Sequence, residues 1–189
     1  MTARPLYLLA TLALLASAGC QHALVAQRQA AKKDRDAEVS KCVEGNGANA
    51  KNAVGLYRWY SGMQMGLFWA LVTNKRQEQL GFVAHNEEGV PVGWEPSVQL
   101  ADRKLPGEDG MLNLVVGRKS VTFNYTVENG KPEIEPLASD GKDNTSLALS
   151  LIRRAAGKPV CLEFPEIDYV TCFSTKGATE AMKPDAWLP

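Results

Sequence analysis

The sequence lacks an excess of charge of either sign, because 21 lysines and arginines balance 21 aspartates and glutamates. A chain with balanced, mixed charge is not built to neutralise phosphates, which argues against nucleic acid as a partner. Internal repeats and long low-complexity tracts are also absent. The apolar fraction of 45% is ordinary for a globular protein.

Histidine is scarce, and no stretch carries a recognisable catalytic motif. His22 lies near the start of the chain, a poor position for catalysis. His85 ends an expected strand, where it could act as a base or a metal ligand, but no second His or Cys has ligand spacing to it. A lone histidine at a strand end is more often a surface residue. We therefore expect no enzyme, no metal and no cofactor. An exported hydrolase that uses His85 or loop carboxylates is the alternative.

The acidic residues give no better catalytic signal, because they fall in expected loops or on the exposed side of a strand. A glycosidase can build its acid and nucleophile from any two acids that meet in space, but the sequence favours no pair. Residues 140–144 lack the order of acids, glycine and final Glu of an EF-hand calcium loop. Their simpler role is to turn the chain into a following helix.

The first twenty residues have the three parts of a secretory signal. Arg4 supplies a positive start, Leu6 to Ala16 form an apolar run too short for a permanent membrane helix, and small residues follow. The ending Ala16-Ser17-Ala18-Gly19-Cys20 resembles the lipobox of bacterial lipoproteins, although that family prefers Leu where this chain has Ser17. The same residues also fit an A-x-A cleavage site, which would leave a soluble periplasmic or secreted protein that starts at Gly19.

The lipoprotein resemblance implies an anchor at Cys20. The cysteine would become the first mature residue and carry lipid such as palmitate. Gln21 follows it, whereas enteric lipoproteins retained in the inner membrane commonly have Asp there. The resemblance therefore implies the cell envelope, facing the periplasm, with the outer membrane favoured over the inner.

An exported chain permits disulfides, and the four cysteines are Cys20, Cys42, Cys161 and Cys172. Residues 160–164 and 169–173 alternate as two strands of a hairpin folded about residues 165–168. One register sets Phe164 opposite Tyr169 and Val160 opposite Phe173, and it also sets Cys161 opposite Cys172 on the other face. We therefore predict a disulfide between Cys161 and Cys172. Cys42 is left unpaired or joined to Cys20.

We predict a signal peptide at residues 1–19, a tether or loose helix at 20–47, and one globular domain at 48–189. Removal of the signal leaves 189 − 19 = 170 residues, enough for one compact core. Residues 48–60 show helical spacing with a stop at Ser61-Gly62, and a buried strand is expected within 63–72. Residues 53–72 also have small-xxx-small spacing, but Arg58, Gln64 and the glycines argue against a membrane helix.

The remainder predicts β-structure and one clear helix. The expected strands are 80–84 and 90–92 about a turn at 86–89, then 112–116, 121–127 and an edge strand at 131–137, with 95–110 as a loop. Asn144 or Thr145 is expected to cap a helix whose apolar stripe comprises Leu147, Ala148, Leu151, Ile152 and Ala155. Residues 175–189 are expected to be a partly docked tail anchored by Trp187. The predicted fold is α+β, an antiparallel sheet built from hairpins with one or two packed helices.

The lipoprotein-like signal at residues 1–20 and the lack of a catalytic motif favour an envelope lipoprotein that binds another protein. Two variants are open, a periplasmic inhibitor or immunity protein and an accessory subunit of an envelope assembly. Exposed loops are the expected binding elements. Acids that could meet a basic site on the partner are Glu87, Glu88, Glu95, Asp102, Glu108 and Asp109. The alternative is that these loops are merely solvated.

Overall fold

The computed structural model describes residues 29–30, 32–33, 35–37, 58–101, 105, 109–136, 141 and 143–183. The chain divides into two compact units, residues 1–36 and 37–189. The described residues of the first unit are helical. Cys20, Cys42 and Trp187 lie outside the described residues, so the predictions about them stay predictions. No helix in the described ranges is both long and apolar enough to cross a membrane.

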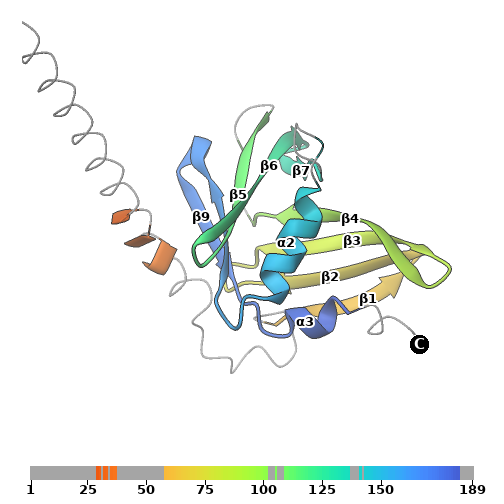
Figure 1. Cartoon of the computed structure of the whole chain (residues 1–189). Coiled ribbons are helices and arrows are strands. Elements are labelled where there is room, and N and C mark those ends of the chain that lie inside the picture. The colour runs from red at the N-terminus through yellow and green to blue at the C-terminus, as the bar shows by residue number, and fades with distance from the viewer. Residues whose placement is uncertain are drawn as a thin grey trace, which may run out of the picture. The chain divides into compact units, whose positions relative to one another are not determined.

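The described part of the second unit consists mainly of two antiparallel sheets (Figure 1). Sheet A has the strand order β1-β2-β3-β4 and sheet B the order β7-β6-β5-β8-β9. The strands of sheet A are β1 (Tyr60–Gln64), β2 (Leu67–Thr73), β3 (Gln79–Glu87) and β4 (Val90–Gln99). The strands of sheet B are β5 (Asp109–Val116), β6 (Lys119–Glu128), β7 (Lys131–Ile134), β8 (Val160–Phe164) and β9 (Tyr169–Phe173). The α+β prediction therefore holds only loosely, because sheets dominate and the single expected sheet is two.

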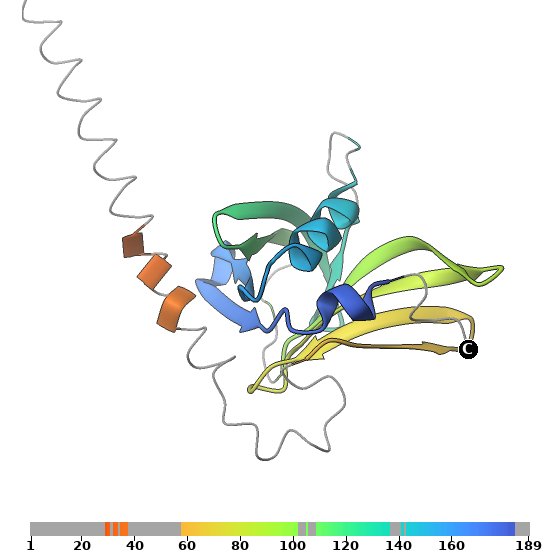
Figure 2. The ribbon, with the colours of Figure 1, turned by 60° about the horizontal axis from the view of Figure 1, so that its bottom comes forward.

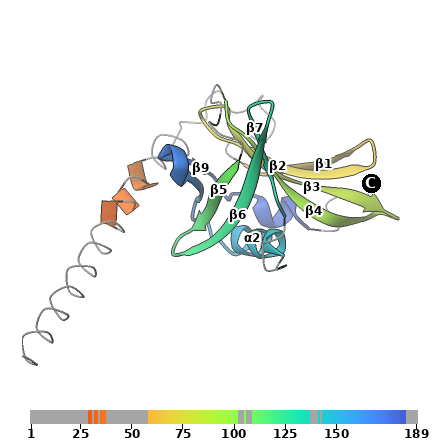
Figure 3. The ribbon, with the colours of Figure 1, turned by 90° about the horizontal axis from the view of Figure 1, so that it is seen from above.

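The helices are short: α2 (Asn144–Arg153), the 3₁₀ turn η2 (Pro165–Ile167) and α3 (Ala178–Ala181). Strands of sheet B cross those of sheet A when the molecule is seen from above (Figure 3). α2 contacts β4, β5 and β6, and α3 contacts α2 and β1. One continuous core joins residues of both sheets and of α2 and α3. Alternation with period two places these residues on the inner faces, as with Phe82 of β3 and Phe123 of β6.

The prediction of a helix that reaches Tyr60 and stops at Ser61-Gly62 is wrong at its end, because these residues belong to β1. The preceding residues 48–57 lie outside the described part of the chain. Met65 and Gly66 have φ of 52° and 78° and form the turn of a β1–β2 hairpin. Two successive positive φ angles give the turn a twist that matches antiparallel strands. A tight turn inside an apolar run thus replaces the expected helix-to-strand boundary.

The prediction of a loop at 95–110 is also wrong at both ends, since Glu95–Gln99 continue β4 and Asp109-Gly110 begin β5. Gly93, at a φ of 64°, lies in an irregularity where pairing shifts between Val83 and His85. β4 then resumes as the edge of sheet A, the kind of strand in which a proline such as Pro96 is tolerated. The bulge interrupts the alternation of side chains and the proline is unusual in strands, so the sequence pattern did not predict the second half of β4.

The other hairpins confirm their predicted turns. β3 and β4 meet at Glu88-Gly89, and β6 and β7 meet at Asn129-Gly130, where both residues have positive φ. β7 is the edge of sheet B, a position in which its proline, Pro132, is tolerated. The β8–β9 register pairs Phe164 with Tyr169, Leu162 with Thr171 and Val160 with Phe173, as predicted. Cys161 and Cys172 face each other with Cα atoms 4.0 Å apart and form the predicted disulfide.

α2 is confirmed, but its cap and its buried face differ from the prediction. Asp143 is the N-cap and accepts a hydrogen bond from the Ser146 N–H at 2.8 Å, whereas Asn144 and Thr145 lie inside the helix. Leu147 is 51% exposed because the buried face runs through Thr145, Ala148 and Ile152 instead. In the C-terminal segment, burial of Ala178, Ala181 and Met182 docks α3 on the core.

Candidate functional site

The predicted acidic residues do not form one surface. Glu87 and Glu88 are exposed at the tip of the β3–β4 hairpin, and Glu95 is exposed further along β4. Asp109 is exposed at the start of β5 in the other sheet. Asp102 and Glu108 lie outside the described residues. The structure therefore brings Glu87 and Glu88 together and places Asp109 on a different element.

Asp109 belongs to an acidic neighbourhood around the Tyr125 hydroxyl. Burial, and then the negative charges of Glu166 and Asp109, raise the pKa of Tyr125. Glu166 also accepts a hydrogen bond from the Met111 N–H at 2.9 Å. Burial and the neighbouring negative charges therefore stabilise the protonated phenol of Tyr125.

His85 is exposed on β3, and its cross-strand neighbours are Leu67 and Val92. Apolar neighbours on both sides supply neither a proton acceptor nor a metal ligand. Across the described ranges, no group of three or more His, Cys, Asp or Glu side chains is placed to hold a metal ion. The directly paired residues therefore give His85 no catalytic partner.

Exposed apolar side chains gather at one end of sheet A. The β1–β2 and β3–β4 hairpins extend together beyond α2 and sheet B, with their turns at the same end (Figures 1 and 2). We call residues 63–67 and 85–92 the distal hairpin ends. Met65 is 94% exposed, Val90 56% and Met63 51%. The Asn86 N–H donates to the Gly66 carbonyl at 3.0 Å and ties the two ends together.

The sheet A face that points away from the core carries further apolar side chains, among them the exposed Tyr60 and the half-buried Trp69. Val90 lies on this face, whereas Met63 pairs with the buried Phe68 and lies on the opposite face. The rings of Tyr60 and Trp69 lie 5.7 Å apart on β1 and β2. Gly62, directly opposite Trp69, leaves room for this ring, because a Cβ there would come within 2.5 Å of it. The sequence interpretation treated residues 63–72 as buried. The turn at Met65-Gly66 gave no clear signal in the sequence, because methionine rarely takes the positive φ that Met65 has here.

A buried polar cluster joins the two sheets. Glu78, only 2% exposed, accepts hydrogen bonds from the hydroxyls of Tyr169 and Thr171 of β9. The Asn74 amide donates to Glu78 at 3.0 Å and to Thr171 Oγ1 at 2.7 Å. Burial and the hydrogen bond to Glu78 raise the pKa of Tyr169 to about 12, against the opposing effect of Arg76. A carboxylate so enclosed links the β2–β3 turn to β9 and is not open to a ligand.

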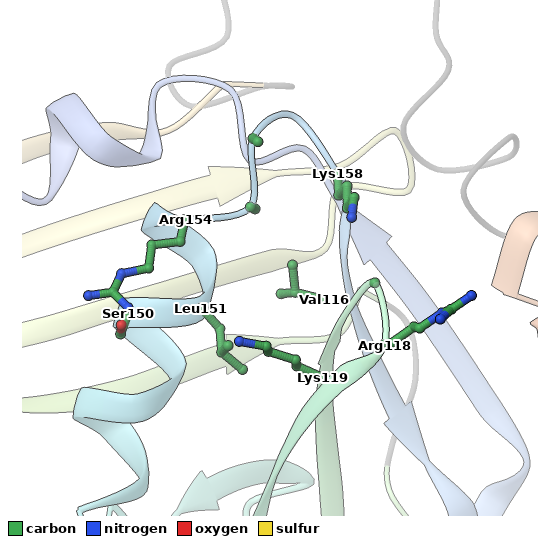
Figure 4. Close-up of a pocket in the computed structure, with 10 residues that line it drawn as sticks. Val116, Arg118, Lys119, Ser150, Leu151, Arg154 and Lys158 are labelled. Atoms are coloured by element: carbon green, nitrogen blue, oxygen red, sulfur yellow. The ribbon is translucent and has the colours of Figure 1, made fainter.

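A basic hollow of about 570 Å³ lies between the end of α2 and the β5–β6 turn (Figure 4). The cations that line it are Arg118, Lys119, Arg154 and Lys158. Its remaining lining is small or apolar and includes Val116, Leu151 and Ala155. Of these cations, only Arg154 lies at the end of the helix that the sequence predicts. Lys158 follows in the next turn, but Arg118 and Lys119 come from the β5–β6 turn, more than thirty positions earlier, so no local sequence pattern predicts the hollow.

Comparison of the chain with protein-family models, with curated proteins and with solved structures finds no match.

Proposed function

We propose that this chain is an envelope-anchored lipoprotein that acts as a protein-binding module, with the distal hairpin ends as its contact surface. The lipid anchor at Cys20 and a periplasm-facing position at the outer membrane rest on the signal-like start of the sequence. The binding role is either that of an inhibitor or immunity protein or that of an accessory subunit of an envelope assembly.

The observation that carries the binding role is the exposure of Met63, Met65 and Val90 on two projecting, mutually bonded hairpins. Large exposed apolar side chains cost free energy in water and mark interaction surfaces when they cluster. Methionine is enriched at protein interfaces, because its flexible side chain adapts to a partner.

The charge around these side chains indicates the chemistry of the partner. Glu87 and Glu88 lie at the same tip, beside Val90. An apolar centre with a carboxylate rim is complementary to an apolar patch bordered by lysine or arginine. The partner we propose is therefore a protein with a basic rim. Of the six acids that the sequence suggested for such a contact, Glu87 and Glu88 lie at this surface.

Site-specific photocrosslinking in the native cells tests this proposal. A photoreactive amino acid at Met65 should yield a discrete protein adduct, which the double change Glu87→Lys and Glu88→Lys should reduce. The same reporter at Leu147, 51% exposed on α2, is the control and should yield no such adduct. Equal adducts from both positions, or no protein adduct from Met65, would rule out the distal hairpin ends as the contact surface.

A further inference from the structure

The basic hollow concentrates positive charge in a chain whose total formal charge is balanced. Four cationic side chains line it, and no acidic side chain does. Within the part of the chain that the structure describes, none of the four forms an ion pair. Cations gathered without a counter-charge repel one another and produce a local positive potential that favours anions.

The positions of the cations distinguish an inner pair from an outer pair. In Figure 4, Lys119 extends from the β5–β6 turn toward α2 and Leu151, and Lys158 lies on the opposite rim with Val116 between them. Arg118 and Arg154 point away from the centre in the same view. The two lysines are therefore the groups best placed to meet a ligand in the hollow, and the arginines add charge at its edge.

The Lys158 side chain lies beside the β5–β6 turn at Gly117. Gly117 takes a φ of 62° in the β5–β6 turn, a conformation that favours glycine. A Cβ at this position would contact Lys158, 3.4 Å from Cδ and 3.7 Å from Nζ. The lysine stem thus lies against the turn, at the distance of ordinary van der Waals contact from a Cβ at this position.

The carboxyl end of α2 would oppose an anion if its carbonyl groups were free. Two of these groups are occupied, because the Ser150 carbonyl accepts from the Arg154 N–H and the Ile152 carbonyl accepts from the Ala155 N–H. In the turn that follows, the Ala155 carbonyl accepts from the Lys158 N–H. Their lone pairs are engaged in the helix end and its following turn. The full positive charges of the lysine ammonium groups also exceed the partial negative charge, about half an elementary charge, of the helix end.

We propose that the basic hollow binds a phosphoryl group of a ligand that also carries an apolar portion. The ammonium groups of Lys119 and Lys158 would meet the phosphate oxygens, and the Val116, Leu151 and Ala155 side chains would contact the apolar portion. Lysine binds phosphate as a point charge with three donors. Two sources share this chemistry, an anionic phospholipid headgroup and a free phosphate compound. This proposal is independent of the proposed protein binding.

Lysine footprinting on the full chain tests the proposal at residue resolution. The rate of acetylation of each lysine is measured by mass spectrometry with and without inorganic pyrophosphate, and with phosphatidylglycerol vesicles against phosphatidylcholine vesicles. Acetylation of Lys119 and Lys158 should fall at least fivefold with one of the two anionic probes. Lys131 and Lys176, exposed elsewhere on the described surface, should change less than twofold.

The outcome of each arm has a defined meaning. Protection by pyrophosphate supports a free phosphate compound, and protection only by phosphatidylglycerol supports a lipid headgroup. Equal change at all four lysines, or no change at Lys119 and Lys158, would overturn the proposal. Protection by a glutamate-rich peptide but by neither phosphate probe would overturn it as well, in favour of an acidic protein segment. Lys119→Gln with Lys158→Gln should remove saturable probe binding, whereas Lys131→Gln with Lys176→Gln should leave it within twofold.

Discussion

Cys161 and Cys172 show how far single residues can be placed from sequence alone. Strand side chains alternate with period two, so the register that pairs the apolar residues of β8 and β9 also fixes which cysteines meet. The structure pairs them in that register and joins them. No information from distant parts of the chain was needed, because both strands and their turn are contiguous.

Loss of this disulfide should destabilise the domain. The bridge spans a sequence separation of 11, for which the chain-entropy model gives a stabilisation of about 3 kcal/mol. Cys161→Ser should lower the melting temperature and release one more titratable thiol in denaturant. Cys42→Ser is the control and should leave the bridge intact. Peptide mapping of the unreduced protein checks the pairing, and a Cys42 crosslink to either cysteine would contradict it.

Glu78 marks the limit of residue-level prediction. Its partners Tyr169 and Thr171 are 91 and 93 positions away in sequence, and a charged residue in a turn carries no sign that it will be buried. Only the packing of the β2–β3 turn against β9 makes the contact. The same applies to the basic hollow, whose lysines belong to different elements.

The Tyr169 hydroxyl should titrate far above a free phenol, because the folded protein raises its pKa from 10.0 to about 12. The raised pKa means that folding favours the protonated phenol, so this contribution to stability is complete below about pH 10 and is lost as the pH rises through 12. Phenolate absorbance should show a component near pH 12 that Tyr169→Phe removes. Unchanged titration in Tyr169→Phe would contradict the assignment, and Tyr60→Phe, at an exposed position, is the control.

At the scale of elements, turns formed by residues that favour positive φ were predictable from the sequence, and turns formed by other residues were not. The pair Asn129-Gly130 predicts the β6–β7 hairpin, because glycine and asparagine tolerate positive φ. Met65-Gly66 makes an equivalent turn within an apolar run, and a methionine at positive φ gives no such signal. The helix cap was displaced by one residue for a similar reason, since Asp143, Asn144 and Thr145 can all act as caps.

The N-cap of α2 should contribute to stability in a pH-dependent way. Hydrogen bonds from the Ser146 hydroxyl and N–H lower the pKa of Asp143 below 3.8. The contribution is therefore present above the ordinary aspartate pKa and is lost as the pH falls through the lower folded value. Asp143→Ala should cost about 1 kcal/mol in urea unfolding at pH 7. Asp143→Asn should retain the cap but lose the dependence on acid, and an equal loss in both variants would contradict the capping role.

At the scale of the whole molecule, local pattern could not divide the strands between two sheets. Strand order depends on which edges meet, and β4 and β7 lie close in space without a shared ladder. The sequence therefore predicted hairpins and their turns but not the crossing of the sheets, nor the projection of two hairpins beyond the core. Those features create the distal hairpin ends.

The anchoring prediction concerns the whole protein in its cell. Cys20→Ser should release the protein from the membrane fraction or block its processing, because the acylated sulfur is lost. Palmitate labelling followed by fractionation measures both effects, with Cys42→Ser as the control that should keep its label. Mass spectrometry that finds an unmodified mature terminus at Gly19 would replace the lipid anchor with ordinary secretion.

The most direct test of the proposed function is the affinity for the partner that crosslinks at the distal hairpin ends. Met63 and Met111 are 51% and 49% exposed, but only Met63 lies in the proposed contact surface. Calorimetry with purified proteins should show that Met63→Ser weakens binding at least tenfold, because it removes apolar contact. Met111→Ser should change binding less than twofold. Equal effects of the two changes, or full affinity in Met63→Ser, would contradict the account.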